Sequence, residues 1–548
     1  MLALLLWWPA ALLAPPCRTA APTARCRLHA LLSEPAAPSH LLTHAWWPVA
    51  ISHSLEKTRP HPIQLLGRRL VLWHDGGAWC CVRDACAHRF APLSEGRVHG
   101  GCVQCAYHGW AFRRDGSCAR VPQAAEEAQP AATRARVERF LTREEAGMVW
   151  VWGDSSEDAE AMSEAALPLP ISPLLRQQSE ALPQAGFMRD LPYGYELLGE
   201  NLLDLSHLPF SHHGLALLNR ADAQPLQLRP IAPPTPASSD VGSGGRAGAS
   251  PTFSVAVENA PAADPILVSM ASRLPSMVDA DTASVNISFF SPHHVRYERI
   301  LRPGVAFNVE LFLCPTTAGH SRVFLFNTAA QRPPLPPLLR AAMLATLSLR
   351  SFQRLLLGGK PARRSKPGSA DDHAIANEIF DGDGVFLHYQ GQRMAERELT
   401  FRDYFIPTSA DSMVIRFRRW LASAQESSPE LKDMFGHKSA PLDTRLPGAR
   451  AALLDRYESH TRHCSLCSAE LARVRSASAR CARLSELCSA MVGGAVAACV
   501  GRGVTARVGS LIAGVGLLAV MRLERAKSVL GEYEKQFVFK DHVHAEKD

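Results

Sequence analysis

The sequence lacks several features that would place it in a class at once. No apolar run reaches the roughly 20 residues that a membrane-spanning helix needs. Fourteen cysteines among 548 residues are too few for a disulfide scaffold and favour a reducing compartment. The formal net charge is +7, but no basic face is interleaved with aromatic residues, so the sequence predicts no nucleic-acid partner.

Acidic residues are missing from the N-terminal segment between Met1 and Ser33. Arg18, Arg25 and Arg27 are spread there among Ala, Pro and Thr, which is typical of an organelle transit peptide. The opening MLALLLWWPAALLA is also similar to the apolar part of a secretory signal. We therefore predict a targeting peptide over residues 1–40, either a two-step import signal or a plain secretory signal.

The rest of the chain is too long for one hydrophobic core, which favours two or three domains. Short apolar runs separated by Gly, Pro and Asp turns predict an all-β domain over residues 45–155. Longer strand-like runs predict a domain with an antiparallel sheet over residues 185–450, and RFRRWL within it has helical spacing. Its Pro/Gly/Ser-rich stretch 229–251 is expected to be a disordered insertion. The later segment PPLPPLLRAAMLATLSLRSFQRLLLG is expected to form a helix.

The C-terminal segment, residues 455–548, differs in composition. Leu487–Val500 and Val508–Met521 are apolar runs of 14 residues each, joined by GRGVTAR. Runs of about 10–14 residues are ambiguous between crossing a membrane and lying on it. We expect a membrane-associated helical hairpin, and the sequence leaves open whether it crosses the bilayer or only docks on it. The predicted fold class is thus α+β with a helical tail.

Two short motifs, Cys86-x-His88 and Cys105-x-x-His108, lie on either side of a Gly-containing loop. Each motif supplies one Cys and one His, whereas zinc fingers usually pair Cys with Cys and His with His. This division matches a Rieske [2Fe–2S] centre, in which two His replace two Cys on one iron. We predict that the two Cys bind the inner iron and the two His bind the more exposed one. A structural zinc site is the alternative.

A second metal motif follows in YELLGENLLDLSHLPFSHHG. Asn201, Asp204, His207 and His212 fit N-x-x-D-x-x-H-x-x-x-x-H, and the first two spacings of three predict that Asn201, Asp204 and His207 lie along one helix. Pro209 is expected to end or kink this helix near residue 208. A mononuclear iron(II) oxygenase needs two His and one carboxylate on one face of the metal. The pattern predicts His207 and His212 as ligands, with His213 as a competitor of His212.

The carboxylate ligand is expected from a distant part of the chain. NEIFDGDGVFLHYQ offers Asp383, which we prefer, and Asp381 as the alternative. Each could instead make a simple Asp-Gly turn.

With these motifs in place, the sequence resembles the plastid Rieske oxygenases of the pheophorbide a oxygenase type. This group includes the chlorophyllide a oxygenases and the 55-kilodalton inner-envelope translocon component. The resemblance runs through WWPVA, LGRRLVLWHD, CAHRFAPLSEG, CAYHGWAF, ENLLDLSHLPFSHH, IFDGDGVFL, FIPTSAD, RYESHTRHCSLC and QFVFKDHVHAEK. The family's Cys-Pro-His is Cys-Ala-His here, because Ala87 replaces the proline, and no ligand is lost.

The resemblance implies a helix-grip (START-like) domain that holds the iron, and a homotrimer in which one subunit's cluster faces the next subunit's iron. Asp204 would be the carboxylate that bridges a cluster His and an iron-ligand His, with Asn201 beside it. Reduced ferredoxin would supply electrons, and O₂ would oxygenate a chlorophyll-related tetrapyrrole. The implied location is the chloroplast, at the inner envelope or thylakoid membrane.

Cys464 and Cys467 form a C-x-x-C pair, a spacing that permits a reversible disulfide. In the resembling family this pair is similar to a thioredoxin target, so thioredoxin is a candidate partner. His460 and His463 lie close enough in sequence for a small zinc site to be the alternative.

Two functions follow from these motifs. The first is a Rieske non-haem iron oxygenase, and the alternative is a non-catalytic redox-sensing or import-associated protein of the inner envelope. His207, His212 and Asp383 favour the oxygenase, because a sensor has no use for an open iron site.

Overall fold

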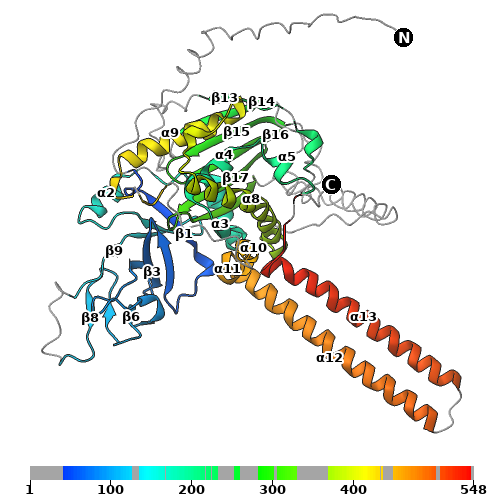
Figure 1. Cartoon of the computed structure of the whole chain (residues 1–548). Coiled ribbons are helices and arrows are strands. Elements are labelled where there is room, and N and C mark those ends of the chain that lie inside the picture. Colours follow the sequence, from blue (N-terminus) through cyan, green and yellow to red (C-terminus); the bar gives the residue numbers. More distant parts are fainter. Residues whose placement is uncertain are drawn as a thin grey trace, which may run out of the picture.

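The computed structural model describes residues 41–125, 135–166, 168–215, 218–223, 225–231, 252–258, 282–301, 305–329, 368–431, 433–435, 449–501, 506–542 and 544. Figure 1 shows a smaller β unit, a larger unit of sheet and helices, and a long helical hairpin that projects from the body. The predicted targeting peptide and the predicted helix near residues 333–358 lie outside the described residues.

The smaller unit consists of three antiparallel sheets, with strand orders β1-β11-β10, β2-β3-β4-β9 and β5-β6-β7-β8. Its strands are short, as the closely spaced turn residues predict. Their bounds are β1 Trp46–Ile51, β2 His61–Leu65, β3 Arg68–His74, β4 Trp79–Arg83, β5 Arg97–His99, β6 Cys102–Gln104, β7 Ala111–Phe112, β8 Cys118–Arg120, β9 Arg139–Phe140, β10 Thr142–Glu145 and β11 Met148–Trp152.

One buried cluster of this unit lies directly under the two Cys/His motifs. Trp73, Val103 and Phe112 are fully buried in it, and Cys86 and Cys105 belong to the same cluster. The apolar packing therefore fixes the backbone of both motifs from below.

The larger unit is built on a seven-stranded sheet in the order β12-β18-β17-β16-β15-β14-β13, and every neighbouring pair is antiparallel. This confirms the α+β class and the antiparallel sheet. The strands are β12 Phe187–Leu191, β13 Gln227–Ile231, β14 Phe253–Glu258, β15 Thr282–Phe290, β16 His294–Leu301, β17 Val305–Pro315 and β18 Ser321–Ala329.

The first three residues of the expected insertion at residues 229–251 form part of a strand instead. Residues 229–231 belong to strand β13, which pairs with β14 at the end of the sheet. Pro230 is compatible with this position, because an edge strand can leave one side without a backbone donor. Residues 232–251 lie outside the described residues.

Helices pack on this sheet and supply the second candidate site. The first is α4, Tyr195–Leu203, which packs against α9, Ser412–Glu426, through Gly199 and Phe417. Helix α9 contains the predicted RFRRWL segment. The long helix α8 spans Ala370–Glu396, and the shorter helices are α2 Ala159–Ala165, α3 Pro173–Ala181, α5 Leu208–Ser211, α10 Ala449–Leu453 and α11 Arg456–Ser459.

Helix α8 is anchored by a buried ion-pair network. The Asp381 carboxylate accepts from Arg189 on β12 at 2.6 Å and from Arg456 on α11 at 2.6 Å, and all three side chains are at most 3% exposed. Arg189 also donates to the backbone carbonyl of Asn377, one turn earlier on α8, at 2.9 Å. These contacts fix both the position and the rotation of α8.

The C-terminal hairpin consists of α12, Ser465–Gly501, and α13, Ala506–Val538, which lie side by side (Figure 1). The hairpin itself agrees with the prediction, which left open whether its apolar runs cross a membrane. Across the described residues, we find no helix with a stretch long and apolar enough to cross a membrane. The physical reason is length, since each predicted run has 14 residues and a span needs about 20.

The contact between α4 and α9 gives a stability prediction. A methyl group on Gly199 would lie 2.1 Å from the Phe417 ring, so Gly199→Ala forces α4 and α9 apart. We expect the free energy of unfolding to fall by about 1–3 kcal/mol, as for overpacked cores. The matched control is Gly531→Ala on α13, where an added methyl meets no atom within 4 Å and the better helix propensity raises stability by up to about 1 kcal/mol. Denaturant titration measures both, and equal effects would contradict the packing argument.

Candidate functional site

The first site is formed by two loops with matching backbone hydrogen bonds. In the first loop, the Cys86 N–H donates to the Ala91 carbonyl at 2.9 Å, and the Phe90 N–H donates to the Cys86 carbonyl at 2.8 Å. In the second loop, the Cys105 N–H donates to the Trp110 carbonyl at 2.8 Å, and the Gly109 N–H donates to the Cys105 carbonyl at 3.0 Å. The two loops therefore repeat one turn geometry around the two cysteines.

The repeat extends to the backbone dihedrals. The fourth residue after each Cys has positive φ, with 60° at Phe90 and 76° at Gly109. Glycine adopts this conformation at no steric cost, whereas a bulky residue is strained there. Phe90 nevertheless occupies it with 81% of its side chain exposed.

The four motif side chains divide by burial. Cys86 and Cys105 are each 2% exposed, whereas His88 is exposed and His108 is partly buried, and the two imidazole ring centroids lie 4.7 Å apart. The His88 ring stacks on Trp110 at 4.8 Å with an interplanar angle of 2°. The thiols thus lie inside and the imidazoles outside, as expected for an inner Cys-bound and an outer His-bound iron.

These four residues are not arranged around one ion. Two groups of three or more ligand atoms lie within 4.8 Å of one another in the described part of the chain, and neither contains a residue of these loops. A tetrahedral zinc site requires such a compact group, whereas a two-iron cluster separates the Cys pair from the His pair. The geometry therefore favours the Rieske interpretation over the zinc alternative.

The surroundings of Cys86 act on the pKa of its thiol in two opposite directions. Burial raises the pKa of Cys86 to about 11, while the backbone N–H groups of His88 and Arg89 donate toward the sulfur and act in the opposite direction. Backbone donors to a thiolate of this kind are among the means by which a protein tunes an iron–sulfur centre.

The second motif folds differently from the predicted single helix. Helix α4 ends at Leu203, and Asp204 is its extended C-cap residue, with φ −101° and ψ 116°. The Asp204 carboxylate accepts from the backbone N–H of Ser206 at 2.7 Å and from its hydroxyl at 2.6 Å. This local turn competes with helix continuation. The prediction that Asn201, Asp204 and His207 share one helix was therefore wrong, and the chain turns five residues before Pro209.

The turn brings His207 and His212 together at the short helix α5, and Asp383 reaches them from α8. The Asp383 Oδ1 atom lies 3.6 Å from His207 Nε2 and 3.3 Å from His212 Nε2. Ligands about 2.1 Å from a shared ion are about 3.0–3.6 Å apart at bond angles of about 90–120°. The three atoms form one of the two compact groups in the described residues.

The structure distinguishes the alternatives that the sequence left open. Asp383 lies in this group, whereas Asp381 is occupied by Arg189 and Arg456. Neither residue makes an Asp-Gly turn, because both lie inside helix α8. His212 is 1% exposed and faces Asp383, whereas the Nδ1 atom of His213 accepts from the backbone N–H of Arg220 at 3.1 Å.

Electrostatics favour an anionic Asp383 between two imidazoles. Burial alone would raise the pKa of Asp383, but His212 and His207 outweigh it and hold this pKa well below its usual range. Burial alone would lower the pKa of His207, but Asp383 and Asp204 raise it. The Asp383 carboxylate is negative and lies between two imidazoles that its charge favours in the protonated form. A metal cation at this site can take the place of the imidazole protons.

The chemistry of this donor set fits iron(II). Two imidazoles and one carboxylate on one side of a metal form the facial triad of non-haem iron(II) oxygenases. The Nε2 atom of His212, which faces Asp383, is buried without a well-formed hydrogen bond within the described residues, as expected for a nitrogen whose partner is a metal. The protein is thus equipped for both a Rieske [2Fe–2S] cluster and a mononuclear iron.

Asp204 and Asn201 flank the His207 ring. Asp204 Oδ2 lies 3.5 Å from His207 Nδ1, on the side of the ring away from Asp383, and its side chain is 26% exposed. Asn201 Nδ2 lies 3.4 Å from His207 Nε2. A carboxylate behind a ligating imidazole orients the ring and raises its basicity.

Sequence reasoning missed two residues of this site. The Ser211 hydroxyl donates to Asp383 Oδ1 at 2.8 Å and so fixes the carboxylate. A methyl on Gly382 would lie 3.4 Å from both His212 Nδ1 and His542 Nε2, an ordinary van der Waals distance, so the C-terminal segment reaches the back of the site. The Asp-Gly-Asp-Gly pattern gave no specific signal for this contact.

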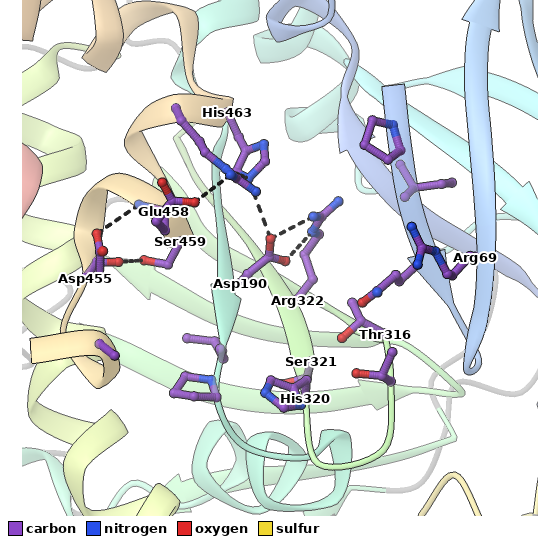
Figure 2. Close-up of a pocket in the computed structure, with 18 of the residues that line it drawn as sticks. Arg69, Asp190, Thr316, His320, Ser321, Arg322, Asp455, Glu458, Ser459 and His463 are labelled. Atoms are coloured by element: carbon purple, nitrogen blue, oxygen red, sulfur yellow. Dashed lines mark hydrogen bonds and ion pairs between the residues drawn. The ribbon is translucent and has the colours of Figure 1, made fainter. Parts of the chain in front are cut away.

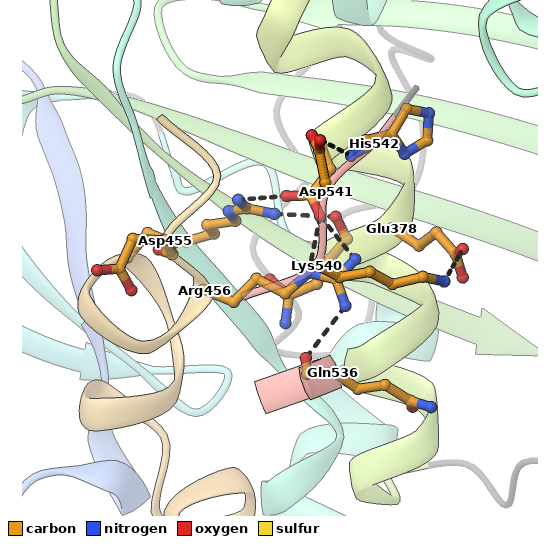
Figure 3. Close-up of polar contacts among 11 residues, drawn as sticks. Glu378, Asp455, Arg456, Gln536, Lys540, Asp541 and His542 are labelled. Atoms are coloured by element: carbon orange, nitrogen blue, oxygen red, sulfur yellow. Dashed lines mark hydrogen bonds and ion pairs between the residues drawn. The ribbon is translucent and has the colours of Figure 1, made fainter. Parts of the chain in front are cut away.

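Figure 3 shows how that C-terminal segment is fixed beside α8. Lys540 donates to Glu378 on α8 at 2.8 Å, and Arg450 donates to the Asp541 carboxylate at 2.9 Å and to the His542 carbonyl at 2.6 Å. The end of the hairpin therefore returns to the helix that carries Asp383.

A cavity of about 600 Å³ lies between the two units, lined by β2 and β3 on one side and by β12, β18 and α11 on the other. Figure 2 shows Asp190 and Arg322 paired in it, with donor–acceptor distances of 2.6 and 2.8 Å, and His463 close to Asp190. No residue of the His207–His212–Asp383 group lines this cavity, so we do not assign it to the substrate.

Cys464 and Cys467 are buried thiols at the start of α12. They lie with His460 and with His373 from α8 in the second compact group of potential ligands. His463 is outside this group, because its Nε2 atom lies 4.0 Å from Asp190 and accepts from Arg462.

Residues 45–139 match the Rieske [2Fe-2S] domain family. The chain is 31% identical to the chloroplastic pheophorbide a oxygenase of Oryza sativa subsp. japonica, over 92% of this chain and 85% of that protein. It is 30% identical to the Arabidopsis thaliana protein of the same name, over 91% and 83%. It is 28% identical to flavonoid 8-hydroxylase 2, chloroplastic, of Ocimum basilicum, over 78% and 73%.

The similarity to the rice and Arabidopsis proteins covers more than nine-tenths of this chain and therefore spans both candidate metal sites. Together with the Rieske domain and the His/His/Asp group, it confirms the enzyme prediction and the prediction of both cofactors. The chain belongs to the plastid Rieske-type oxygenases related to pheophorbide a oxygenase, and it is a Rieske non-haem iron oxygenase.

Proposed function

We propose that this enzyme oxygenates a chlorophyll-related tetrapyrrole of the pheophorbide a or chlorophyllide a type, using O₂ and electrons from ferredoxin. The compact group of His207, His212 and Asp383 carries the oxygenase part of the proposal, since an electron carrier needs no second metal centre. When bound, the two cofactors supply electron transfer and O₂ activation, respectively.

The substrate class rests on the relatives. Two relatives that align with more than nine-tenths of this chain are both named pheophorbide a oxygenase. The basil protein is named for a flavonoid and aligns over less of the chain at lower identity. A tetrapyrrole is therefore our first candidate and a flavonoid is the competitor. The chloroplast is the proposed location, because all three names include it.

The chain's own residues then have defined tasks. Cys86, His88, Cys105 and His108 would hold the cluster on the β unit. His207, His212 and Asp383 would hold the iron. The Ser211 hydroxyl fixes the Asp383 carboxylate through its hydrogen bond at 2.8 Å. Burial of His212 and Asp383 keeps water away from this side of the metal.

Asp204 is the proposed link between subunits. Its carboxylate lies behind His207 and is partly exposed, so an imidazole of a neighbouring subunit can reach it. In a homotrimer that imidazole would be a cluster ligand such as His108. Asp204 would then hold both rings at once and fix the distance between the two centres.

The hairpin is the proposed docking element for a chloroplast membrane, without crossing it. Near its tip, Met491 on α12 and Leu511 on α13 are 73% and 68% exposed. Exposed apolar side chains gathered on both helices suit an interfacial position from which an apolar substrate is delivered.

The substrate proposal is tested by supplying the purified enzyme with reduced ferredoxin, isotopically heavy O₂ and a panel of chlorins, bilins and a flavone. We expect label in a tetrapyrrole product, detected by mass spectrometry, and none with His207→Ala. Label in the flavone product alone would contradict the substrate class and leave the oxygenase intact. No labelled product from any compound would contradict the proposed function.

The two neighbouring aspartates of α8 give a matched pair of variants. Asp383→Asn should lower iron affinity at the mononuclear site by at least about tenfold, because loss of a supporting residue alone costs about 10–100-fold. Its Rieske EPR signal should persist. Asp381→Asn should instead lower the free energy of unfolding by about 3–5 kcal/mol, because it leaves two buried arginines without their anion. Metal analysis and denaturant titration measure the two effects. Loss of iron in Asp381→Asn, together with a mere loss of stability in Asp383→Asn, would show that Asp381 is the ligand.

The bridging role of Asp204 predicts a defect in electron transfer with both centres present. Asp204→Asn should slow reoxidation of the reduced cluster in stopped-flow measurements with substrate and O₂ by about 10–100-fold. Ser206→Ala is the control, because it removes a donor to Asp204 but keeps the carboxylate. Reoxidation at the wild-type rate in Asp204→Asn would contradict the bridge.

A further inference from the structure

We propose that His373, His460, Cys464 and Cys467 bind one Zn²⁺ ion in a closed structural site, separate from both catalytic centres. The four residues come from helix α8, from the residue after α11, and from the start of α12. All are buried, with at most 7% of any side chain exposed. Their ligand atoms all lie within 4.8 Å of one another.

The printed distances agree with the edges of a zinc tetrahedron. His373 Nδ1 lies 3.4 Å from Cys464 Sγ and 3.5 Å from Cys467 Sγ, and His460 Nε2 lies 3.3 Å from Cys467 Sγ. With Zn–S bonds of about 2.3 Å and Zn–N bonds of about 2.0–2.1 Å at tetrahedral angles, adjacent sulfur and nitrogen atoms are about 3.5 Å apart. The side chains are therefore already spaced for a central ion.

The His460 ring is oriented as a ligand requires. Its Nδ1 atom lies 2.6 Å from the carbonyl oxygen of Met188 on β12, and a carbonyl can only accept, so Nδ1 carries the proton. The lone pair is then on Nε2, which faces Cys467. Metal-binding histidines are commonly fixed in this way by a backbone carbonyl on the opposite ring nitrogen.

Charge and ligand type favour zinc. Two thiolates and two neutral imidazoles form the Cys₂His₂ set of structural zinc sites. The ion and the two thiolates sum to zero charge, which lowers the cost of burying the group. Zinc binding releases one proton from each thiol and changes no oxidation state.

A disulfide between Cys464 and Cys467 explains the site less well. It would leave His373 Nδ1 and His460 Nε2 facing sulfur atoms that have no proton to donate. Buried imidazole nitrogens without partners are costly. Zinc uses all four side chains, whereas a redox pair uses only two of them.

The site would connect the hairpin to the helix that carries the iron ligand. His373 lies in the first turn of α8, and Asp383 lies ten residues later on the same helix. Cys467 lies in the first turn of α12, at the base of the hairpin. A bound ion would thus hold α8, α11 and α12 together where the hairpin leaves the body.

The test is elemental analysis of the full-length holoenzyme, purified without chelators, together with four single variants. We expect about one zinc per chain in the wild type, in addition to the iron. Cys467→Ser and His373→Ala should lower zinc affinity by at least about tenfold while the Rieske EPR signal persists. The controls are Cys488→Ser on α12 and His463→Ala in the same loop, which lie outside the group and should keep the zinc.

A second measurement does not depend on the variants folding. Co²⁺ exchanged into the wild-type enzyme should give the visible bands of a tetrahedral cobalt site and a thiolate-to-cobalt charge-transfer band. Peptide mass spectrometry should show Cys464 and Cys467 alkylated only after a chelator has removed the metal. A Cys464–Cys467 disulfide in the zinc-free native enzyme, or iron in place of zinc at these residues, would overturn the proposal.

Discussion

The position of helix α8 depends on one buried carboxylate. Asp381 is held between Arg189 and Arg456, which come from β12 and α11, and none of the three is more than 3% exposed. Successive helix residues are rotated by about 100°, so Asp383 lies about 200° around the helix from Asp381. When the two arginines fix one face of α8, they necessarily turn Asp383 toward His207 and His212 on the other. The catalytic metal site therefore depends on an ion pair that takes no part in the chemistry.

This arrangement explains the Asp-Gly-Asp-Gly sequence in physical terms. Each aspartate serves a different face of the helix, and Gly382 lies between them where His212 and His542 approach α8. Glycine inside a helix costs about 1 kcal/mol relative to alanine, and the contacts of α8 offset that cost. The same helix carries His373 at its start, so three polar sites share one rigid element.

Burial separates the predicted ligands of the Rieske cluster into an inner cysteine pair and an outer histidine pair. The cysteines of the two matching loops are buried in the β core, and the histidines are left toward the surface beside Trp110. Asp204 is likewise partly exposed behind His207. In one chain these two groups belong to different units, and the proposed Asp204 bridge would join them between subunits.

The sequence by itself determined the chemistry of each centre. The Cys/His loops could be read directly, because their ligands lie two or three residues apart and local turns bring them together. The antiparallel sheet also followed from the local pattern of apolar residues.

The end of α4 was missed, because the Asp204–Ser206 turn outcompeted the helical spacing. Whether the hairpin crosses a membrane was left open by its two apolar runs, and no helix in the described residues is long and apolar enough to do so. Only the tertiary structure selected Asp383 over Asp381 and His212 over His213, and placed His373 beside a cysteine pair some 90 residues away. These choices depend on which side of a helix meets which partner, and that is fixed by packing between segments far apart in the chain.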